Sequence, residues 1–117
     1  MTQRSPESLA RGYYESIDAG DYDRLSGLLA DDFRQVRGDR TLEGRETFVR
    51  FMREERPVKD TTHEVDAVYR SEAGDEVAIR GRMRRPDGSV GLGFVDVFAV
   101  EGDRLSRLDT YSNRRIE

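Results

Sequence analysis

Val90-Gly91-Leu92-Gly93-Phe94-Val95-Asp96-Val97-Phe98-Ala99-Val100 is the longest apolar run in the chain. Valine and phenylalanine favour a β-strand, in which alternate side chains point to opposite faces of a sheet. Both sets of alternate residues are apolar apart from Asp96, so the pattern predicts a central strand that is buried on both faces. A carboxylate there is unfavourable unless it is paired, hydrogen-bonded or protonated. Asp96 is therefore the leading candidate for a functional residue.

The residues before this strand predict helices. The first helix should begin at Ser5, an N-cap that precedes a proline, and should end at Gly20. A second helix should follow directly, capped by Asp21 and ending near Ala30. The apolar face of the first helix repeats every four residues and comprises Leu9, Tyr13 and Ile17.

A short strand over 32–37 is expected next, and then a third helix that follows Thr41-Leu42-Glu43-Gly44 and ends at Pro57. The predicted core face of that helix comprises Phe48, Phe51 and Met52. Later strands are predicted over 61–69, 76–84, 90–100 and 105–114. We interpret Gly81, Gly91 and Gly93 as bulges or bends that curve the sheet. Short turn-forming connections indicate antiparallel neighbours, so the order predicts one α+β domain over 1–117.

Composition limits the classes of function. The 117 residues are 35% hydrophobic and 38% charged, which indicates a thin core and favours a homodimer that shares apolar surface. The absence of cysteine excludes disulfides, thiolate zinc sites and cysteine nucleophiles. A net charge of −4 argues against nucleic-acid binding. No apolar run approaches the ~20 residues of a membrane span, and no signal peptide is recognisable, so we expect a cytoplasmic protein.

Asp96 has two interpretations. It could be a carboxylate that faces solvent or pairs with an arginine, or it could be a pocket carboxyl whose pKa is raised by burial. In the second case it would donate a hydrogen bond to a substrate oxygen when protonated, or act as a base when ionised.

Other polar residues could share a pocket with it. Tyr13 lies on the apolar face of its helix, where a buried phenol needs a partner, whereas Tyr14 points about 100° away and is the weaker candidate. His63 is the single histidine and could move a proton, but alone it predicts no metal site. Arg37 could pair with Asp96 or hold a ligand carboxylate. Tyr111 and Asn113 share a strand face and could add contacts at the pocket mouth.

Four stretches resemble the nuclear transport factor 2-like superfamily, which includes ketosteroid isomerase, SnoaL-like polyketide cyclases and limonene epoxide hydrolase. They are Tyr13-Tyr14-Glu15-Ser16-Ile17-Asp18-Ala19-Gly20-Asp21, Leu28-Leu29-Ala30-Asp31-Asp32-Phe33, Glu43-Gly44-Arg45-Glu46-Thr47-Phe48 and Leu105-Ser106-Arg107-Leu108-Asp109-Thr110-Tyr111. The resemblance implies three N-terminal helices packed on a strongly curved, mostly antiparallel sheet, the cystatin-like cone. It also implies dimerisation through the sheet.

Compared with ketosteroid isomerase, Tyr13 and Asp96 fall at the positions of the oxyanion hole, and Arg37 replaces the general base. The resemblance thus implies a small-molecule pocket in which His63 could substitute as the base, with no cofactor. Apolar walls are expected from Phe33, Phe48, Phe94 and Phe98. The function could be that of an isomerase, cyclase or hydrolase acting on a small apolar substrate that carries an oxygen. The alternative is a non-catalytic ligand-binding or association module whose cone is filled by its own side chains, with Asp96 and Arg37 as a buried ion pair.

Overall fold

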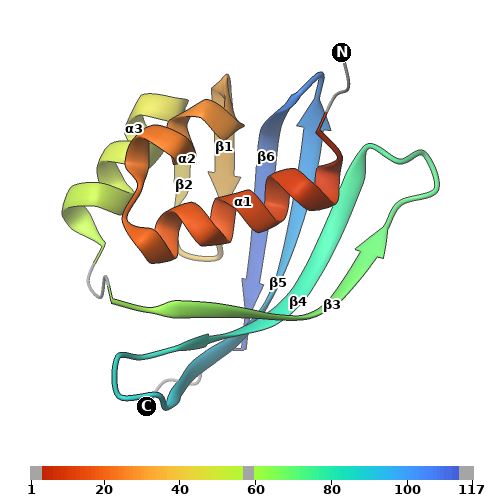
Figure 1. Ribbon diagram of the computed structural model, residues 1–117. Coiled ribbons are helices and arrows are strands. Elements are labelled where there is room, and N and C mark those ends of the chain that lie inside the picture. Colours follow the sequence, from red (N-terminus) through yellow and green to blue (C-terminus); the bar gives the residue numbers. More distant parts are fainter. Residues whose placement is uncertain (1–3, 57–59, 114–117) are drawn as a thin grey trace.

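The computed structural model describes residues 4–56 and 60–113 (Figure 1). Helices come first and long strands follow, as the sequence predicts. The elements in chain order are α1 (Pro6–Ala19), α2 (Tyr22–Leu28), β1 (Leu29–Val36), β2 (Thr41–Glu43), α3 (Arg45–Arg50), a wider π-helical turn η1 (Phe51–Glu55), β3 (Thr62–Arg70), β4 (Glu76–Arg84), β5 (Val90–Glu101) and β6 (Arg104–Ser112).

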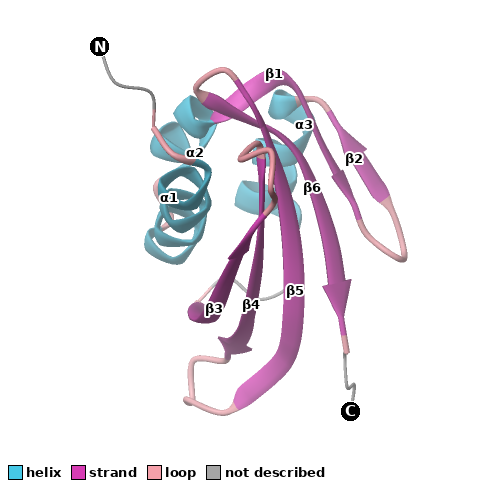
Figure 2. Ribbon diagram, turned by 90° about the vertical axis from the view of Figure 1, so that its right-hand side faces the viewer, coloured by secondary structure: helices cyan, strands magenta, loops and turns pink. Residues whose placement is uncertain are grey.

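The strands form one six-stranded sheet in the order β2-β1-β6-β5-β4-β3. Neighbouring strands are antiparallel except β1 and β6, which run parallel. The sheet is open and strongly curved, and the helices lie against its concave face (Figures 1 and 2). This arrangement confirms the predicted α+β cone. No helix in the described parts of the chain is long and apolar enough to cross a membrane.

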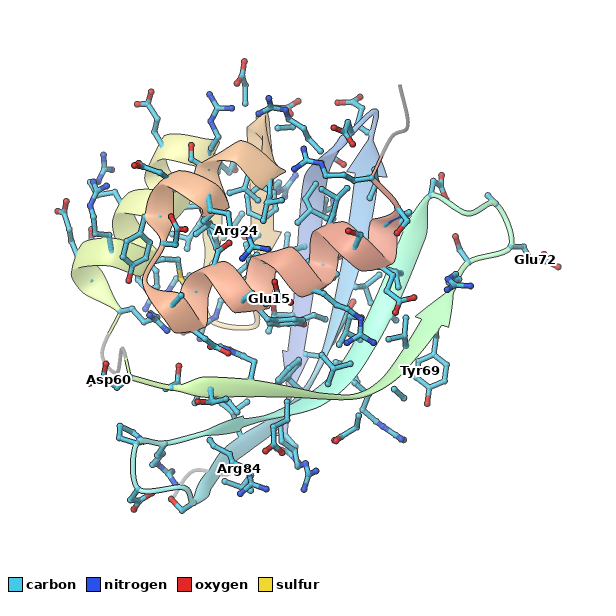
Figure 3. All side chains as sticks on the ribbon, viewed as in Figure 1. Glu15, Arg24, Asp60, Tyr69, Glu72 and Arg84 are labelled. Carbon is cyan, nitrogen blue, oxygen red and sulfur yellow. The ribbon has the colours of Figure 1, made fainter. Side chains whose placement is uncertain are left out.

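Local capping fixes both ends of α1. The Ser5 hydroxyl oxygen accepts the N–H of Ser8 at 3.1 Å, and Gly20 adopts a left-handed φ of 70° that ends the helix. Asp21 then caps α2 by accepting the N–H of Arg24. The side chains of Glu15 and Arg24 meet at 2.8 Å across the two helices (Figure 3). Both are exposed, so this ion pair adds at most about 1 kcal/mol to stability.

Two boundaries differ from the prediction. Helix α2 ends at Leu28 rather than near Ala30, because Leu29 is already extended and pairs with Leu105 of β6. Both leucines are fully buried in the sheet, and that burial outweighs another helical residue. Strand β1 therefore begins three residues earlier than position 32. The prediction also missed β2, a three-residue strand that pairs with the end of β1.

The third helix forms as α3 and then widens into η1. Its predicted core residues Phe48, Phe51 and Met52 are all buried. The predicted end at Pro57 lies outside the described residues. Because a π-helical turn holds more residues than an α-helical one, it changes the direction of the side chains that follow it. Phe51 and Met52 are the first two residues of η1, and both are buried.

Strand β5 is central, but only one of its faces is buried. Phe94, Asp96 and Phe98 lie beneath the helices and are at most 6% exposed. Val95, on the other face, is 36% exposed, so the prediction that both faces are buried was wrong. The reason is architectural, since the helices cover one side of the sheet only (Figure 2).

Glycines mark the bends of the sheet. The register shifts between β3 and β4 at Val65, which lies opposite Gly81, and between β4 and β5 at Gly91. A Cβ atom on Gly81 would lie 2.2 Å from the carbonyl oxygen of Glu64 and 2.8 Å from the Phe94 ring. The close approach of β3 therefore requires glycine at this position, in agreement with the predicted bulge.

We expect Gly81→Ala to lower the free energy of unfolding by about 1–3 kcal/mol or more, because the added methyl group meets backbone. The matched control is Gly27→Ala in α2, where nothing lies within 4 Å of the added atom and a gain of roughly 0.4–1 kcal/mol is expected. Urea denaturation of both variants measures the difference. Equal stability of the two variants would show that the bulge does not need a glycine.

Candidate functional site

A cavity of about 260 Å³ lies where α1, η1 and the concave face of the sheet meet. This volume is below the roughly 300–1,000 Å³ typical of sites for drug-sized ligands, so it fits a small molecule. Its wall is apolar on one side, and polar groups from several strands complete it. The lining residues are Tyr13, Gln35, Arg37, Phe51, Met52, Arg56, His63, Met83, Leu92, Phe94, Asp96, Thr110 and Ser112.

Asp96 is the buried acid of this cavity. It is 6% exposed, and its Oδ2 atom accepts a hydrogen bond of 2.6 Å from the Tyr14 hydroxyl. Its Oδ1 atom is buried without a hydrogen-bond partner among the described residues. Thr110 lies opposite on β6, but it does not reach hydrogen-bond geometry with Oδ1. A buried carboxyl oxygen without a partner is unfavourable, and this distinguishes Asp96 from the other polar groups of the cavity wall.

Burial raises the pKa of Asp96 above its usual range. The hydrogen bond from Tyr14, the nearby Thr110 hydroxyl and the charges of His63 and Arg37 lower this pKa without cancelling the effect of burial. Burial and the neighbouring Asp96 carboxylate also raise the pKa of Tyr14, so its phenol stays a neutral donor. Since Tyr14 donates to Oδ2, a proton bound by Asp96 belongs on Oδ1.

The tyrosine that contacts Asp96 is not the one favoured from the sequence. Tyr13 lines the cavity as predicted, but the hydrogen bond comes from Tyr14, the weaker candidate. Neighbouring elements cover more of the surface of helix α1 than the single apolar face predicted from its sequence. Both tyrosines are therefore nearly fully buried. Their rings meet edge to face at 5.2 Å. Burial also raises the pKa of Tyr13, whose hydroxyl therefore stays protonated in the cavity wall.

His63 is held in the cavity wall by a residue that the sequence analysis missed. One oxygen of Asp18 lies 2.6 Å from His63 Nδ1, and the other accepts the backbone N–H of His63 at 2.8 Å. The imidazole stacks on the Tyr14 ring with the ring centres 5.2 Å apart. The spacing of Tyr14 and Asp18, four residues apart on one helix, is a signal that could have identified Asp18.

Arg37 lines the cavity from the end of β1, on the same side as Gln35, as predicted. Its guanidinium lies 3.3 Å from Asp39 rather than in an ion pair with Asp96, so the expected Asp96–Arg37 pair does not form among the described residues. Gln35 donates a 3.0 Å hydrogen bond to the Thr110 hydroxyl. The polar wall is thus made by contacts between β1 and β6, the one parallel pair of the sheet.

The predicted apolar walls are met only in part. Phe94 lines the cavity. The other three predicted rings, those of Phe33, Phe48 and Phe98, are fully buried and do not line it. Phe98 packs against Tyr13 with ring centres 5.3 Å apart, and Phe33 and Phe48 pack on each other at 4.9 Å. Phe51, Met52, Met83 and Leu92 line the cavity instead.

Tyr111 and Asn113 share a side of the last strand as predicted, but it is the side opposite the cavity. Thr110 and Ser112, which alternate with them, line the cavity. Tyr111 is 61% exposed, and Asn113 accepts the backbone N–H of Gly93 at 3.0 Å. The prediction that Tyr111 and Asn113 contact a ligand at the pocket mouth was therefore wrong. Alternation along the strand identifies the pair, but it does not say which side the helices cover.

The residues described provide no cluster of three or more histidine, aspartate, glutamate or cysteine side chains that could hold a metal ion. Among the described residues, the ionisable groups in and around the cavity are Asp96 with its raised pKa, the Asp18 carboxylate, two phenols, an imidazole and two arginines.

The raised pKa of Asp96 predicts a pH dependence of stability. Below about pH 4, Asp96 is protonated in both states. Above that pH the unfolded chain releases the proton first, so the contribution of Asp96 to the free energy of unfolding falls as pH rises through the folded pKa. The amide introduced by Asp96→Asn cannot titrate and can still accept the hydrogen bond from Tyr14. The stability of wild type relative to this variant should thus decrease from pH 4 upward.

Urea denaturation at unit steps from pH 4 to pH 8 measures this difference. Asp23→Asn, on the exposed first turn of α2, controls for the loss of one negative charge. If the difference in free energy of unfolding between wild type and Asp96→Asn stays constant across this pH range, the raised pKa of Asp96 is contradicted.

Solved structures with the same fold come from several bacteria. A candidate ketosteroid isomerase from Kribbella flavida is 23% identical, with a TM-score of 0.79, over 93% of this chain and 78% of that one. A candidate SnoaL-like polyketide cyclase from Jannaschia is 16% identical, with a TM-score of 0.75, over 97% and 92% of the two chains. A protein with a cystatin-like fold from Methylobium petroleophilum has a TM-score of 0.81 at 11% identity, over 100% of this chain and 81% of that one.

At these identities the structural matches show a shared fold, and no curated protein matches the chain. The family-level evidence is the match of residues 10–108 to the model described as the SnoaL-like domain. That range contains Tyr13, Tyr14, Asp18, His63 and Asp96 and spans most of the chain. The chain therefore belongs to the SnoaL-like domain family, within the nuclear transport factor 2-like superfamily.

Proposed function

We propose that this protein binds a small, partly apolar molecule that carries a carbonyl or hydroxyl oxygen, and that it catalyses proton transfer on it as an isomerase or cyclase. One observation carries the proposal: Asp96 lies in the wall of a cavity, 6% exposed, with Tyr14 on one carboxyl oxygen and no described partner on the other. A ligand oxygen would complete that arrangement. Membership of the SnoaL-like family supports a small-molecule site.

The proposed reaction is the removal of a proton next to a carbonyl group. The C–H bond breaks and His63 takes the proton, while the electron pair moves toward the carbonyl oxygen. The enolate oxygen that forms accepts a hydrogen bond from protonated Asp96, whose other oxygen is held by Tyr14. Return of the proton from His63 to another carbon of the ligand completes an isomerisation. In a cyclisation the enolate carbon instead forms a C–C bond to a second carbonyl carbon of the same molecule, the π electrons of that carbonyl move to its oxygen, and this oxygen takes the proton back from His63. Tyr13 contributes its hydroxyl to the same wall.

The alternative of a non-catalytic module requires a filled cone and an Asp96–Arg37 ion pair. The structure contains a cavity of about 260 Å³, and Arg37 pairs with Asp39. Both observations support ligand binding over a purely structural role for Asp96. Arg37 remains at the cavity wall, where it can attract a ligand carboxylate.

We also propose that two copies associate through the outer face of the sheet. The exposed apolar residues Tyr69, Val95 and Tyr111 lie there, with Val95 directly opposite Tyr111 across β5 and β6. Tyr69 points to the side of the sheet away from α1 (Figure 3). Burying this face would supplement the modest core. A cytoplasmic location stays a prediction from the sequence.

Thermal-shift measurements with small ketones, epoxides, phenols and carboxylates test the binding site. A ligand at a hundred times its dissociation constant adds about 2.7 kcal/mol of stability. For a domain of this size that corresponds to a rise in Tm on the order of 10 °C. We expect such shifts for wild type and their loss in Asp96→Ala. Hits with an acidic C–H bond should exchange that hydrogen in deuterium oxide, and Asp96→Ala should abolish the exchange.

The control is Asp109→Ala, which removes a carboxylate from the neighbouring strand β6 outside the cavity lining and should keep both binding and exchange. If no compound shifts wild type and Asp96→Ala melts much earlier, Asp96 is structural and the enzyme proposal fails. Full exchange activity in Asp96→Ala would also exclude the assigned role.

Sedimentation velocity tests the proposed dimer. Val95→Asp places charge at the centre of the exposed outer face and should give a monomer, while the wild-type chain sediments as a dimer. Asp23→Lys on α2, away from the sheet, should leave the dimer intact. A wild-type chain that is monomeric at tens of micromolar concentration would exclude this interface.

A further inference from the structure

The carboxylate of Asp18 contacts the Nδ1 nitrogen of the His63 imidazole. Neutral histidine has one N–H donor and one acceptor nitrogen, and its partners decide which is which. Asp18 Oδ1 lies 2.6 Å from Nδ1, a short distance for a hydrogen bond. An ionised carboxylate can only accept, so a hydrogen bond of this kind requires the proton on Nδ1.

The second oxygen of Asp18 fixes the orientation of the carboxylate. Oδ2 accepts the backbone N–H of His63 at 2.8 Å, so both carboxyl oxygens are used by one residue. The two side chains are 22% and 14% exposed, which limits competition from water. The imidazole is further restrained by stacking on Tyr14 and by an edge contact with Phe94. His63 is thus held by α1 and β5 in one position of the cavity wall.

We propose that Asp18 is a positioning residue that holds the proton of neutral His63 on Nδ1 and so leaves Nε2 as the proton acceptor of the cavity. This inference rests on the proposed function, in which His63 takes a proton from the ligand. The inference adds to that function a positioning residue, Asp18, and a defined tautomer of His63. Without Asp18, an imidazole with its proton on Nε2 would present a donor where the reaction needs a base.

Asp18→Asn should invert the tautomer, because the backbone N–H of His63 can only donate. The oxygen of the introduced amide must therefore face the backbone nitrogen, which turns the amide NH2 group toward Nδ1. An NH2 group donates, so Nδ1 becomes the acceptor and the proton moves to Nε2. The substitution keeps the shape of the side chain and reverses the role of the nitrogen that is left for a ligand.

The presence of a single histidine makes this directly measurable. Long-range ¹H–¹⁵N correlation spectra of the unliganded protein distinguish a nitrogen that carries a proton from one that does not. The spectra are recorded across a pH titration, so that the neutral imidazole is reached from the charged form. The ionisable groups near the ring include Asp18 from α1 and Asp96 from β5, the Tyr14 phenol lies against it, and Arg37 and Arg56 line the same cavity.

The expected result is a protonated Nδ1 and an unprotonated Nε2 in neutral wild type, and the reverse in Asp18→Asn. The control Asp23→Asn also removes one negative charge and should show the wild-type pattern. A proton on Nε2 in wild type overturns the proposal, and this outcome needs no variant to fold. An unchanged tautomer in folded Asp18→Asn also overturns it, because Asp18 would then only cap the start of β3.

The consequence for catalysis is measured with a ketone that passes the Asp96-dependent screen. Asp18→Asn should lose hydrogen–deuterium exchange by about 100-fold or more, the usual contribution of a general base, while the thermal shift with the same ketone is retained. Exchange at the wild-type rate would overturn the positioning role. The spectra require no ligand, so a failed ligand screen would count against the proposed function and leave the tautomer result unaffected.

Discussion

The hydrogen bond between Tyr14 and Asp96 joins the first helix to the central strand and connects the fold with the site. It spans 82 positions of sequence at 2.6 Å, and both side chains are almost fully buried. The Tyr14 ring also supports His63, which Asp18 holds from one turn further along the same helix. The placement of α1 on the sheet therefore orients both Asp96 and His63.

Much of the fold could be predicted from local chemistry. Caps at Ser5 and Asp21, the left-handed Gly20 and the glycine bulges all act over a few residues, and sequence shows them directly. The short strand β2 was missed because three residues carry too little periodicity. The end of α2 was misplaced because burial of Leu29 against β6 depends on a strand that lies far away in the sequence.

The site was predictable in its central acid and less so in its partners. Asp96 could be identified because it is an aspartate within an apolar strand, where burying a carboxylate is unfavourable. Choosing between Tyr13 and Tyr14 requires the arc of α1 that the sheet and the other helices cover, which one apolar stripe underestimates. Asp18 escaped notice because its position one helical turn from Tyr14 is informative only once Tyr14 is known to face the site, and its contact with His63 depends on the fold. Tyr111 was misassigned because alternation gives two faces and does not label them.

The widened turn η1 has a consequence for how such a domain can change its ligand. It supplies Phe51 and Met52 to the cavity wall, yet it carries none of the groups that hold Asp96 or His63 in place. Length and sequence can vary in this segment while the acid and the imidazole keep their positions. The acid and the imidazole are thus placed by α1 and the sheet, while η1 contributes two apolar side chains to the cavity wall. If this chain has the function proposed above, a change in η1 would reshape the cavity for another ligand and leave its two central polar groups where they are.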